Sequence, residues 1–356
     1  MKAAAAYPYI TSRLLNWFRE HKRELPWRES TDAYRVWISE VILQQTRINQ
    51  GWDYFLRLMD RFPSVESLAE AKEEEVLKLW QGLGYYSRAR NMHAAAKQIV
   101  NDFHGIFPGT YSDILSLRGV GEYTASAIAS IAFNEPRAVV DGNVNRVITR
   151  LFGIGISIHT TEGKKVIAAI AQSLLSPESP GDYNQAVMDF GSMICTPQRP
   201  GCAECMLQDY CVAFAEQRVT YYPVNNRKIN VRKRYFHYFH IVQEKETFLQ
   251  KRVASDIWKN MYEFPLIETT TPMEFSQLEQ TEAFRRLFSG VPSLIVDHRL
   301  TLKHQLTHQL VHTLFYRIII PDAYPFTTPL NSIRIEEKEL ADYPVSRLTD
   351  KYIAII

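Results

Sequence analysis

The sequence lacks a hydrophobic run that approaches the roughly 20 residues needed to span a membrane. Its first nine residues, Met1–Tyr9, are too short for a secretory signal peptide and lack its layout. Apolar residues make up 46% of the 356-residue chain and charged residues 22%, which is ordinary for a soluble globular protein. We therefore expect a cytoplasmic protein, and the length predicts two domains.

A strong charge imbalance is also missing, because the formal net charge is only +2. A nucleic-acid-binding protein of this composition would have to gather its positive potential on one face. One basic run has no acid within it, and a solvated linker is its simpler interpretation, with phosphate contact as the alternative. Its members are Arg218, Arg227, Lys228, Arg232, Lys233 and Arg234.

Cysteine is absent everywhere except between Cys195 and Cys211, where four residues follow the spacing Cys195-x6-Cys202-x2-Cys205-x5-Cys211. This clustering argues against a disulfide framework and predicts one metal site. Four thiolates can hold either a [4Fe–4S] cluster or a tetrahedral zinc ion. Zinc sites more often present two C-x2-C pairs, and this sequence has one.

Strand-like alternation is scarce before residue 215, where helical periodicity dominates, for example over 67–80. After Cys211 the texture becomes polar and basic, and 235–242 and 314–320 are then rich in aromatic and β-branched residues, which predicts strands. Residues 275–289 read as helical. We predict a mostly α domain over 1–216, a basic linker over 217–234 and an α+β domain over 235–356.

Gly119 and Gly121 stand between two predicted helices, the second beginning near Glu122. Two close glycines permit a tight turn, and N–H groups at a helix start can bind a DNA phosphate. An ordinary helix–helix turn is the commoner meaning of this pattern. Asp141 follows about twenty residues later, and it could cap the helix that begins near Asn143 while leaving one carboxylate oxygen free.

A second acid, Glu40, lies within the apolar helical run 36–46. Such an acid is costly unless it is paired or functional. Burial would raise its pKa and keep it protonated near neutral pH, which suits a general acid. The alternative is a salt bridge to Arg28, Arg35 or Arg47.

Four residue strings accompany the 6-2-5 cysteine spacing and the hairpin with its aspartate: Leu25-Pro26-Trp27-Arg28, Ser39-Glu40-Val41, Leu43-Gln44-Gln45-Thr46 and Gly82-Leu83-Gly84-Tyr85-Tyr86-Ser87-Arg88-Ala89-Arg90. Together these features resemble the MutY family of adenine DNA glycosylases, within the helix–hairpin–helix superfamily shared with endonuclease III. The resemblance covers about residues 13–215, with Arg118 where the family usually has proline.

The resemblance implies base excision of adenine opposite 8-oxoguanine or guanine in duplex DNA, by a monomer carrying a structural [4Fe–4S] cluster on the four cysteines. Glu40 would protonate adenine N7 and Asp141 would stabilise the sugar cation. Tyr123 and Asn143 would lie beside Asp141. Contacts to the DNA or to adenine would come from Trp27, Arg28, Leu43, Gln45, Tyr85, Gly119, Gly121 and Gln185.

The alternatives make different demands on the same positions. An endonuclease III-like enzyme acting on oxidised pyrimidines would carry its lyase lysine at position 123 and would have no second domain. Position 123 is tyrosine, which cannot form the Schiff base of β-elimination. A non-catalytic DNA-binding iron–sulfur protein would be expected to have replaced Glu40 or Asp141, and both are present.

The second domain resembles a Nudix fold through Trp258 and Glu263-Phe264-Pro265, but 266–290 lacks the acidic box that would bind magnesium. A nucleotide pyrophosphatase is therefore not expected. The resemblance to MutY implies a Nudix-like reader of 8-oxoguanine, in which Thr307 and His308 contact the lesion. Ordinary polar residues at a strand edge are the other interpretation.

Overall fold

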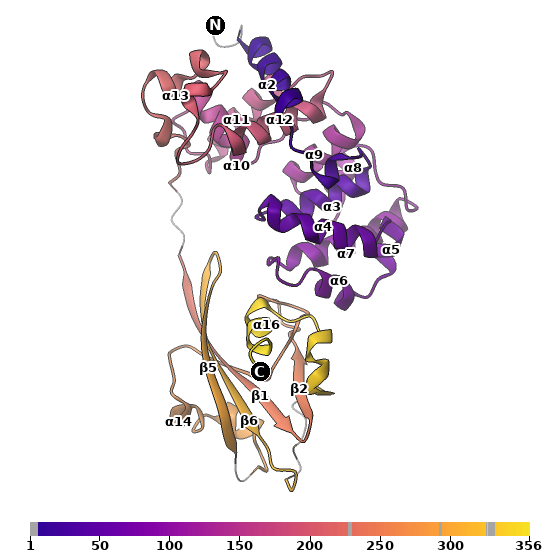
Figure 1. Cartoon of the computed structure of the whole chain (residues 1–356), viewed down its shortest axis with the longest axis vertical. Coiled ribbons are helices and arrows are strands. Elements are labelled where there is room, and N and C mark those ends of the chain that lie inside the picture. Colours follow the sequence, from indigo (N-terminus) through magenta and orange to yellow (C-terminus); the bar gives the residue numbers. More distant parts are fainter. Residues whose placement is uncertain (1–5, 227–229, 292–293, 325, 327–331) are drawn as a thin grey trace. The chain divides into compact units, whose positions relative to one another are not determined.

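The computed structural model describes residues 6–226, 230–291, 294–324, 326 and 332–356 (Figure 1). The chain divides into two compact units. The first comprises Met1–Glu70 and Asn91–Arg227, and the second comprises Ala71–Arg90 and Lys228–Ile356. Two members of the basic run, Arg227 and Lys228, lie outside the described residues.

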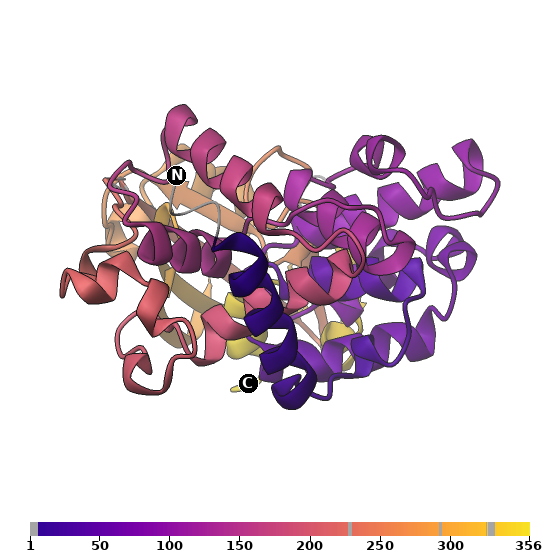
Figure 2. The same ribbon diagram turned by 90° about the horizontal axis from the view of Figure 1, so that it is seen from above.

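The first unit is helical, as predicted, and both views show helices throughout it (Figures 1 and 2). Helix α7 (Ser87–Asp102) crosses the division, so that its first turn belongs to the second unit. The remaining α-helices of the first unit are α2 (Tyr7–His21), α3 (Ala33–Leu43), α4 (Ile48–Arg61), α5 (Val65–Glu70), α8 (Tyr111–Ser116), α9 (Glu122–Phe133), α10 (Gly142–Phe152), α11 (Thr161–Leu174), α12 (Pro180–Met193) and α13 (Val212–Ala215).

The helix expected over 67–80 is in fact two, α5 and the short α6 (Glu73–Leu79). Lys72, between them, has extended backbone angles and starts α6. The start also differs, because the Ser64 hydroxyl accepts a hydrogen bond from the Ser67 N–H at 3.3 Å. Ser67 therefore lies inside α5 and does not begin it.

The core of the first unit forms where α2, α9, α10, α11 and α12 bury their apolar faces together, with Leu14, Val147 and Phe190 almost inaccessible to solvent. Two local signals fix α10 within this core. Asp141 caps its start, and Gly153 ends it with a left-handed backbone (φ 62°) that glycine adopts without strain.

The second unit is built on a seven-stranded mixed sheet with the order β3-β2-β1-β6-β5, in which β4 also pairs with β1 and β7 with β2. The central pair, β1 and β6, is parallel, and the other strand pairs are antiparallel. The strands are β1 (Arg232–Gln243), β2 (Glu246–Lys251), β3 (Tyr262–Glu263), β4 (Leu266–Thr269), β5 (Ile295–Gln305), β6 (Gln309–Ile319) and β7 (Ser332–Glu336).

Aromatic side chains dominate the packing of this unit. Phe239, Phe284 and Tyr316 belong to one cluster, and Phe315 stacks on Tyr352 of α16 (Arg347–Ile353) at 4.3 Å between ring centroids. The strand predicted over 235–242 lies inside β1, and the strand predicted over 314–320 lies in β6 except for Ile320, which follows its last residue. The helix expected over 275–289 is split into α14 (Phe275–Leu278) and α15 (Glu282–Leu287).

The basic run does not form a continuous linker, because β1 begins at Arg232. Arg234 is buried and forms ion pairs with Asp256 at 2.7 Å and Glu268 at 2.6 Å. Its charge is therefore neutralised inside the second unit and is not presented to a phosphate. Among the described residues, no helix is long and apolar enough to cross a membrane.

Candidate active site and cysteine centre

Glu40 lies on α3, and only 9% of its surface is exposed. Burial is the largest cause that raises the pKa of its carboxyl to about 7, and the charge of Asp141 adds to the rise. The hydrogen bond from Tyr123 and the charge of Arg28 act in the opposite direction. The salt bridge offered as the alternative is not the arrangement found. Arg28 binds Asp189 with two hydrogen bonds of 2.8 and 3.1 Å.

Asp141 caps α10, and its Oδ1 accepts the Val144 N–H at 2.7 Å. The second oxygen, expected to be left without a partner, instead accepts the Asn143 side-chain amide at 2.9 Å. Burial raises the pKa of Asp141, while the bonds from Val144 and Asn143 and the charge of Arg146 oppose that rise. The carboxylate is therefore held in one orientation by its own helix.

Tyr123 brings the two acids into one electrostatic environment. It sits in the first turn of α9, and the charges of both Glu40 and Asp141 add to burial in raising its pKa well above the ordinary value. Its hydroxyl lies 3.3 Å from Met188 Sδ on α12. Gln185 is half-buried one turn before Met188, and so it lies on the same face of α12.

Arg146 is a member of this site that the sequence pattern does not single out. Its guanidinium donates to Asn143 Oδ1 at 2.8 Å, to the Gly191 carbonyl at 2.7 Å and to the Cys195 carbonyl at 2.7 Å. Gly191 lets its helix lie close to Asn143 on α10, because a Cβ at position 191 would lie 2.7 Å from the Asn143 Cβ. A basic residue three positions after Asn143 on one helix was the available signal.

Three residues expected to touch DNA have clear partners inside the first unit. Trp27, in η1 (Pro26–Arg28), is buried with its ring edge-on to Phe55, at 5.6 Å between centroids. Leu43 is half-buried and packs over Gly51, while Arg28 is tied to Asp189. Asp189 also pairs with Arg23. The sequence pattern gave no sign of this buried acid between two arginines.

Gln45 and Tyr85 share an unusual feature, although they belong to different units. Both are exposed, and both have left-handed backbones, with φ of 59° for Gln45 and 48° for Tyr85. Residues other than glycine adopt the left-handed region of backbone conformation only at a cost in free energy, and such strained residues are frequent at functional sites. The two positions named from the motif strings are thus locally strained and project into solvent.

The glycine pair forms the turn expected between α8 and α9. Gly119 has φ 77°, and a Cβ at this position would lie 2.5 Å from the Asn91 Cβ. Gly121 is the N-cap of α9, and a Cβ there would meet nothing within 4 Å. The start of α9 is therefore open at Gly121, where its first N–H groups lack helical partners.

Thr307 and His308 are exposed at the tip of the hairpin between β5 and β6, which closes with a 2.8 Å hydrogen bond from the Leu306 N–H to the Gln309 carbonyl. The Thr307 hydroxyl lies 2.7 Å from the Tyr85 hydroxyl. Both residues belong to the second unit. Chain folding thus joins two residues that are 222 positions apart.

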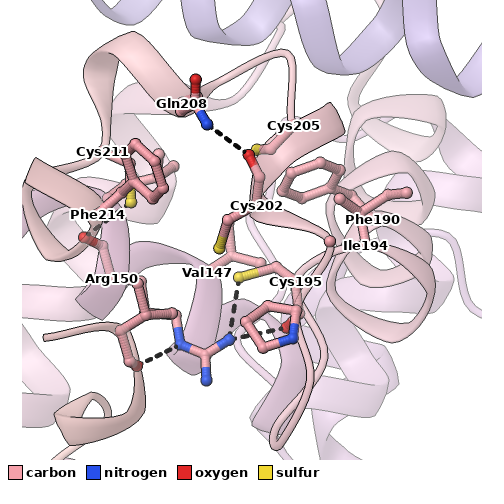
Figure 3. A pocket seen from close by; sticks show the side chains of 14 residues that line it. Val147, Arg150, Phe190, Ile194, Cys195, Cys202, Cys205, Gln208, Cys211 and Phe214 are labelled. Atoms are coloured by element: carbon pink, nitrogen blue, oxygen red, sulfur yellow. Dashed lines mark hydrogen bonds between the residues drawn. The ribbon is translucent and has the colours of Figure 1, made fainter. Parts of the chain in front are cut away.

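The cysteine centre, which we define as Cys195, Cys202, Cys205 and Cys211, lines one cavity (Figure 3). Short turns η2 (Cys202–Glu204) and η3 (Gln208–Tyr210) shape the loop, and the Gln208 amide donates to the Cys202 carbonyl at 2.8 Å. Burial raises the pKa of the Cys205 thiol to about 11. In the described parts of the chain, no three His, Cys, Asp or Glu side chains are arranged to hold a single metal ion.

Comparison with known proteins assigns both parts of the chain. Residues 38–177 match the HhH-GPD superfamily of base excision DNA repair proteins, and 237–354 match the NUDIX domain. An adenine DNA glycosylase of Buchnera aphidicola (subsp. Acyrthosiphon pisum) is 37% identical over 72% of this chain and 74% of its own length. The mouse adenine DNA glycosylase is 46% identical over 58% of this chain but only 42% of its own length.

Solved structures agree on the fold of the helical part. A thermostable thymine-DNA glycosylase superposes with a TM-score of 0.56 at 28% identity, over 60% of this chain and 98% of that protein. A non-covalent endonuclease III–DNA complex gives a TM-score of 0.52 at 21% identity, over 61% of this chain and 99% of that one. The expected helical glycosylase fold followed by a Nudix-like sheet is confirmed.

Proposed function

Because the chain belongs to the adenine DNA glycosylase family, we propose that it removes adenine paired with 8-oxoguanine or guanine, by hydrolysis and without efficient strand cleavage. The observation that carries this proposal is the contrast between the two acids. The Glu40 carboxyl has a pKa near 7 and a hydrogen bond from Tyr123, whereas the Asp141 carboxylate accepts hydrogen bonds from Val144 and Asn143 at the start of its own helix. Two carboxyl groups with separated roles suit cleavage of a glycosidic bond.

Adenine in a duplex is shielded by stacking, so the base must be flipped out before any side chain can reach it. With a pKa near 7, Glu40 carries a proton in about half of the molecules at neutral pH and can deliver it to N7. Protonation turns adenine into a better leaving group. Asp141, held by α10, then faces the positive charge that develops on the sugar.

Gln185 is the residue we propose for reading adenine. It lies on the face of α12 that carries Met188, and Met188 contacts the Tyr123 hydroxyl. A side-chain amide can pair with N6 and N7 of adenine in bidentate fashion. Contact with N7 by Gln185 must end before protonation there, so we expect it to act in selecting the base and not in the chemical step.

The absence of strand cleavage follows from the side chain at position 123. Tyr123 stands in the first turn of α9, where the resemblance to endonuclease III would put a lysine. A phenol forms no Schiff base with the opened sugar, and burial holds the Tyr123 pKa far above neutrality. The strand should therefore break only after alkali acts on the abasic site.

For the partner base, the supporting observation is the bond between the Tyr85 and Thr307 hydroxyls at 2.7 Å. The exposed Tyr85 ring can stack against a base, and the Thr307 hydroxyl can accept from the N7–H that distinguishes 8-oxoguanine from guanine. His308 is the exposed neighbour in the same turn. We propose that this hairpin tip reads the lesion and that the strained Gln45 fills the space left by the flipped adenine.

We further propose that the cysteine centre holds a [4Fe–4S] cluster, which would stabilise the fold of the loop. All four soft ligands line one cavity, and the residues around it include no carboxylate or histidine. Each cysteine binds a different iron in such a cluster, so the four sulfurs need not meet at one point as they must for zinc. Intact protein should contain about four irons per chain, and stoichiometric zinc in anaerobic preparations would overturn this assignment.

One assay tests the proposed activity. Duplexes that carry adenine opposite 8-oxoguanine, guanine or thymine are incubated with excess enzyme and divided into halves with and without alkali. We expect alkali-dependent cuts at adenine in the first two duplexes and intact DNA in the third. A Glu40→Gln variant should bind the mismatched duplex without excision, and wild-type single-turnover rates in that variant would refute the assigned role of Glu40. Gel filtration of the complex should find one protein chain per duplex.

A further inference from the structure

The cysteine cavity contains one charged side chain that the proposed function does not use. Arg150, on α10, points into the cavity beside Cys195 (Figure 3). We infer that Arg150 is a positioning residue of the cysteine centre, which balances the charge of the thiolates and fastens together the two ends of the loop that carries them. This inference rests on the proposed iron–sulfur cluster.

The guanidinium is almost fully withdrawn from water, since Arg150 is 1% exposed. Among the described residues, its hydrogen-bond acceptors are five backbone carbonyls and one sulfur. They are Val219 O at 3.0 Å, Tyr222 O at 3.2 Å, Cys195 O at 3.3 Å, Thr196 O at 2.7 Å, Pro197 O at 3.0 Å and Cys195 Sγ at 3.4 Å. The hydrogen-bonding groups of the guanidinium are thus satisfied by neutral carbonyls.

Its charge is not satisfied in the same way. Among the described residues, no carboxylate forms an ion pair with Arg150, whereas the buried Arg234 has two. An isolated buried cation is costly, and protein interiors pair such charges. A cysteine that binds iron does so as an anionic thiolate. The thiolates of the cysteine centre are therefore the negative charge for which Arg150 is placed.

The same contacts give Arg150 a mechanical role. Nη1 and Nη2 bind the segment 195–197, which enters the cysteine loop, and Nε binds Val219 and Tyr222, which follow the last cysteine. The planar guanidinium joins both segments at fixed angles, which a lysine ammonium cannot reproduce. In addition, an N–H···S bond to a ligand sulfur draws electron density from it, and hydrogen bonds of this kind tune cluster potentials.

The test compares Arg150→Gln and Arg150→Lys with the control Arg199→Gln. Arg199 is an exposed arginine of the same loop, so the control removes one positive charge near the centre from a site in solvent. Each protein is purified anaerobically and analysed for iron, sulfide and zinc. The visible absorbance is then followed under a chelator, and the midpoint of the one-electron couple is measured by titration.

We expect Arg150→Gln to lose its absorbance at least tenfold faster than wild type. Its midpoint potential should shift by about 59 mV, which corresponds to a tenfold change in the ratio of oxidised to reduced protein for a one-electron couple. Arg150→Lys should keep a midpoint potential closer to that of the wild type, because it keeps the positive charge. It should still bleach faster than the wild type, because it loses the planar guanidinium that joins the two segments. If Arg150→Gln does not fold, Arg150→Lys carries the test. Arg199→Gln should match wild type.

Two different results would count against these ideas, and they can be told apart. If wild-type protein contains four irons and both Arg150 variants bleach and titrate like it, the role of Arg150 is wrong and the cluster stands. Equal effects in Arg199→Gln and Arg150→Gln would also overturn it, since any nearby positive charge would then suffice. If wild-type protein contains zinc or no metal, the proposed cluster fails and the role of Arg150 fails with it.

Discussion

Replacing Glu40 by glutamine should stabilise the protein at alkaline pH, because the group that serves catalysis is costly to bury as an anion. Burial raises the pKa of Glu40 from 4.5 to about 7. Between these values the folded chain holds a proton that the unfolded chain releases, so the free energy of unfolding falls as pH rises. The contribution of Glu40 to the free energy of unfolding is fully present below pH 4.5 and lost above pH 7.

The size of the effect follows from the same shift. A rise of roughly 2.5 units at about 1.4 kcal/mol each costs the wild type about 3 kcal/mol by pH 8. Glutamine keeps the shape of the side chain and carries no charge. Part of this cost is already present at pH 5, so the difference in unfolding free energy between Glu40→Gln and wild type should grow by about 2.5 kcal/mol from pH 5 to pH 8.

Urea unfolding followed by circular dichroism at several pH values measures this difference. Glu20→Gln is the matched control, because Glu20 is exposed on α2 and its replacement removes a carboxylate from a site in solvent. A pH-dependent difference below about 1 kcal/mol for Glu40→Gln would show an ordinary carboxyl pKa. In that case Glu40 would be ionised at neutral pH, and its role as general acid would have to be abandoned.

Other expectations concern the reaction and the lesion. The single-turnover excision rate should fall tenfold per pH unit above about pH 7, as Glu40 loses its proton. Tyr123→Phe removes a hydrogen bond that lowers the Glu40 pKa, so in this variant the fall in rate should begin at higher pH. A rate that does not depend on pH would contradict both statements. Asp141→Asn should slow excision by at least about two orders of magnitude, and a loss under tenfold would leave Asp141 as a helix cap only. Thr307→Ala combined with His308→Ala should weaken binding to 8-oxoguanine:adenine about tenfold more than to guanine:adenine, whereas equal losses would indicate contact with the backbone alone.

Local sequence patterns determined much of the architecture. Helical periodicity and capping residues placed Glu40 inside α3 and Asp141 at the start of α10, since both features depend on neighbours three or four positions away. Aromatic and β-branched residues marked β1 and β6, and the cysteine spacing defined one loop. At 67–80 the periodicity predicted a single helix, but the structure has two, because an extended Lys72 interrupts the run.

Which polar groups meet was decided by the tertiary structure. Arg28 reaches Asp189 across 161 positions, and Tyr85 reaches Thr307 across 222. No periodicity spans such separations, because these partners depend on which helix faces and strand ends the packing of apolar side chains brings together. The sequence alone supplied the chemical groups and their local geometry, while burial, the pKa of Glu40 and the position of Arg150 exist only once the core has excluded water from around them.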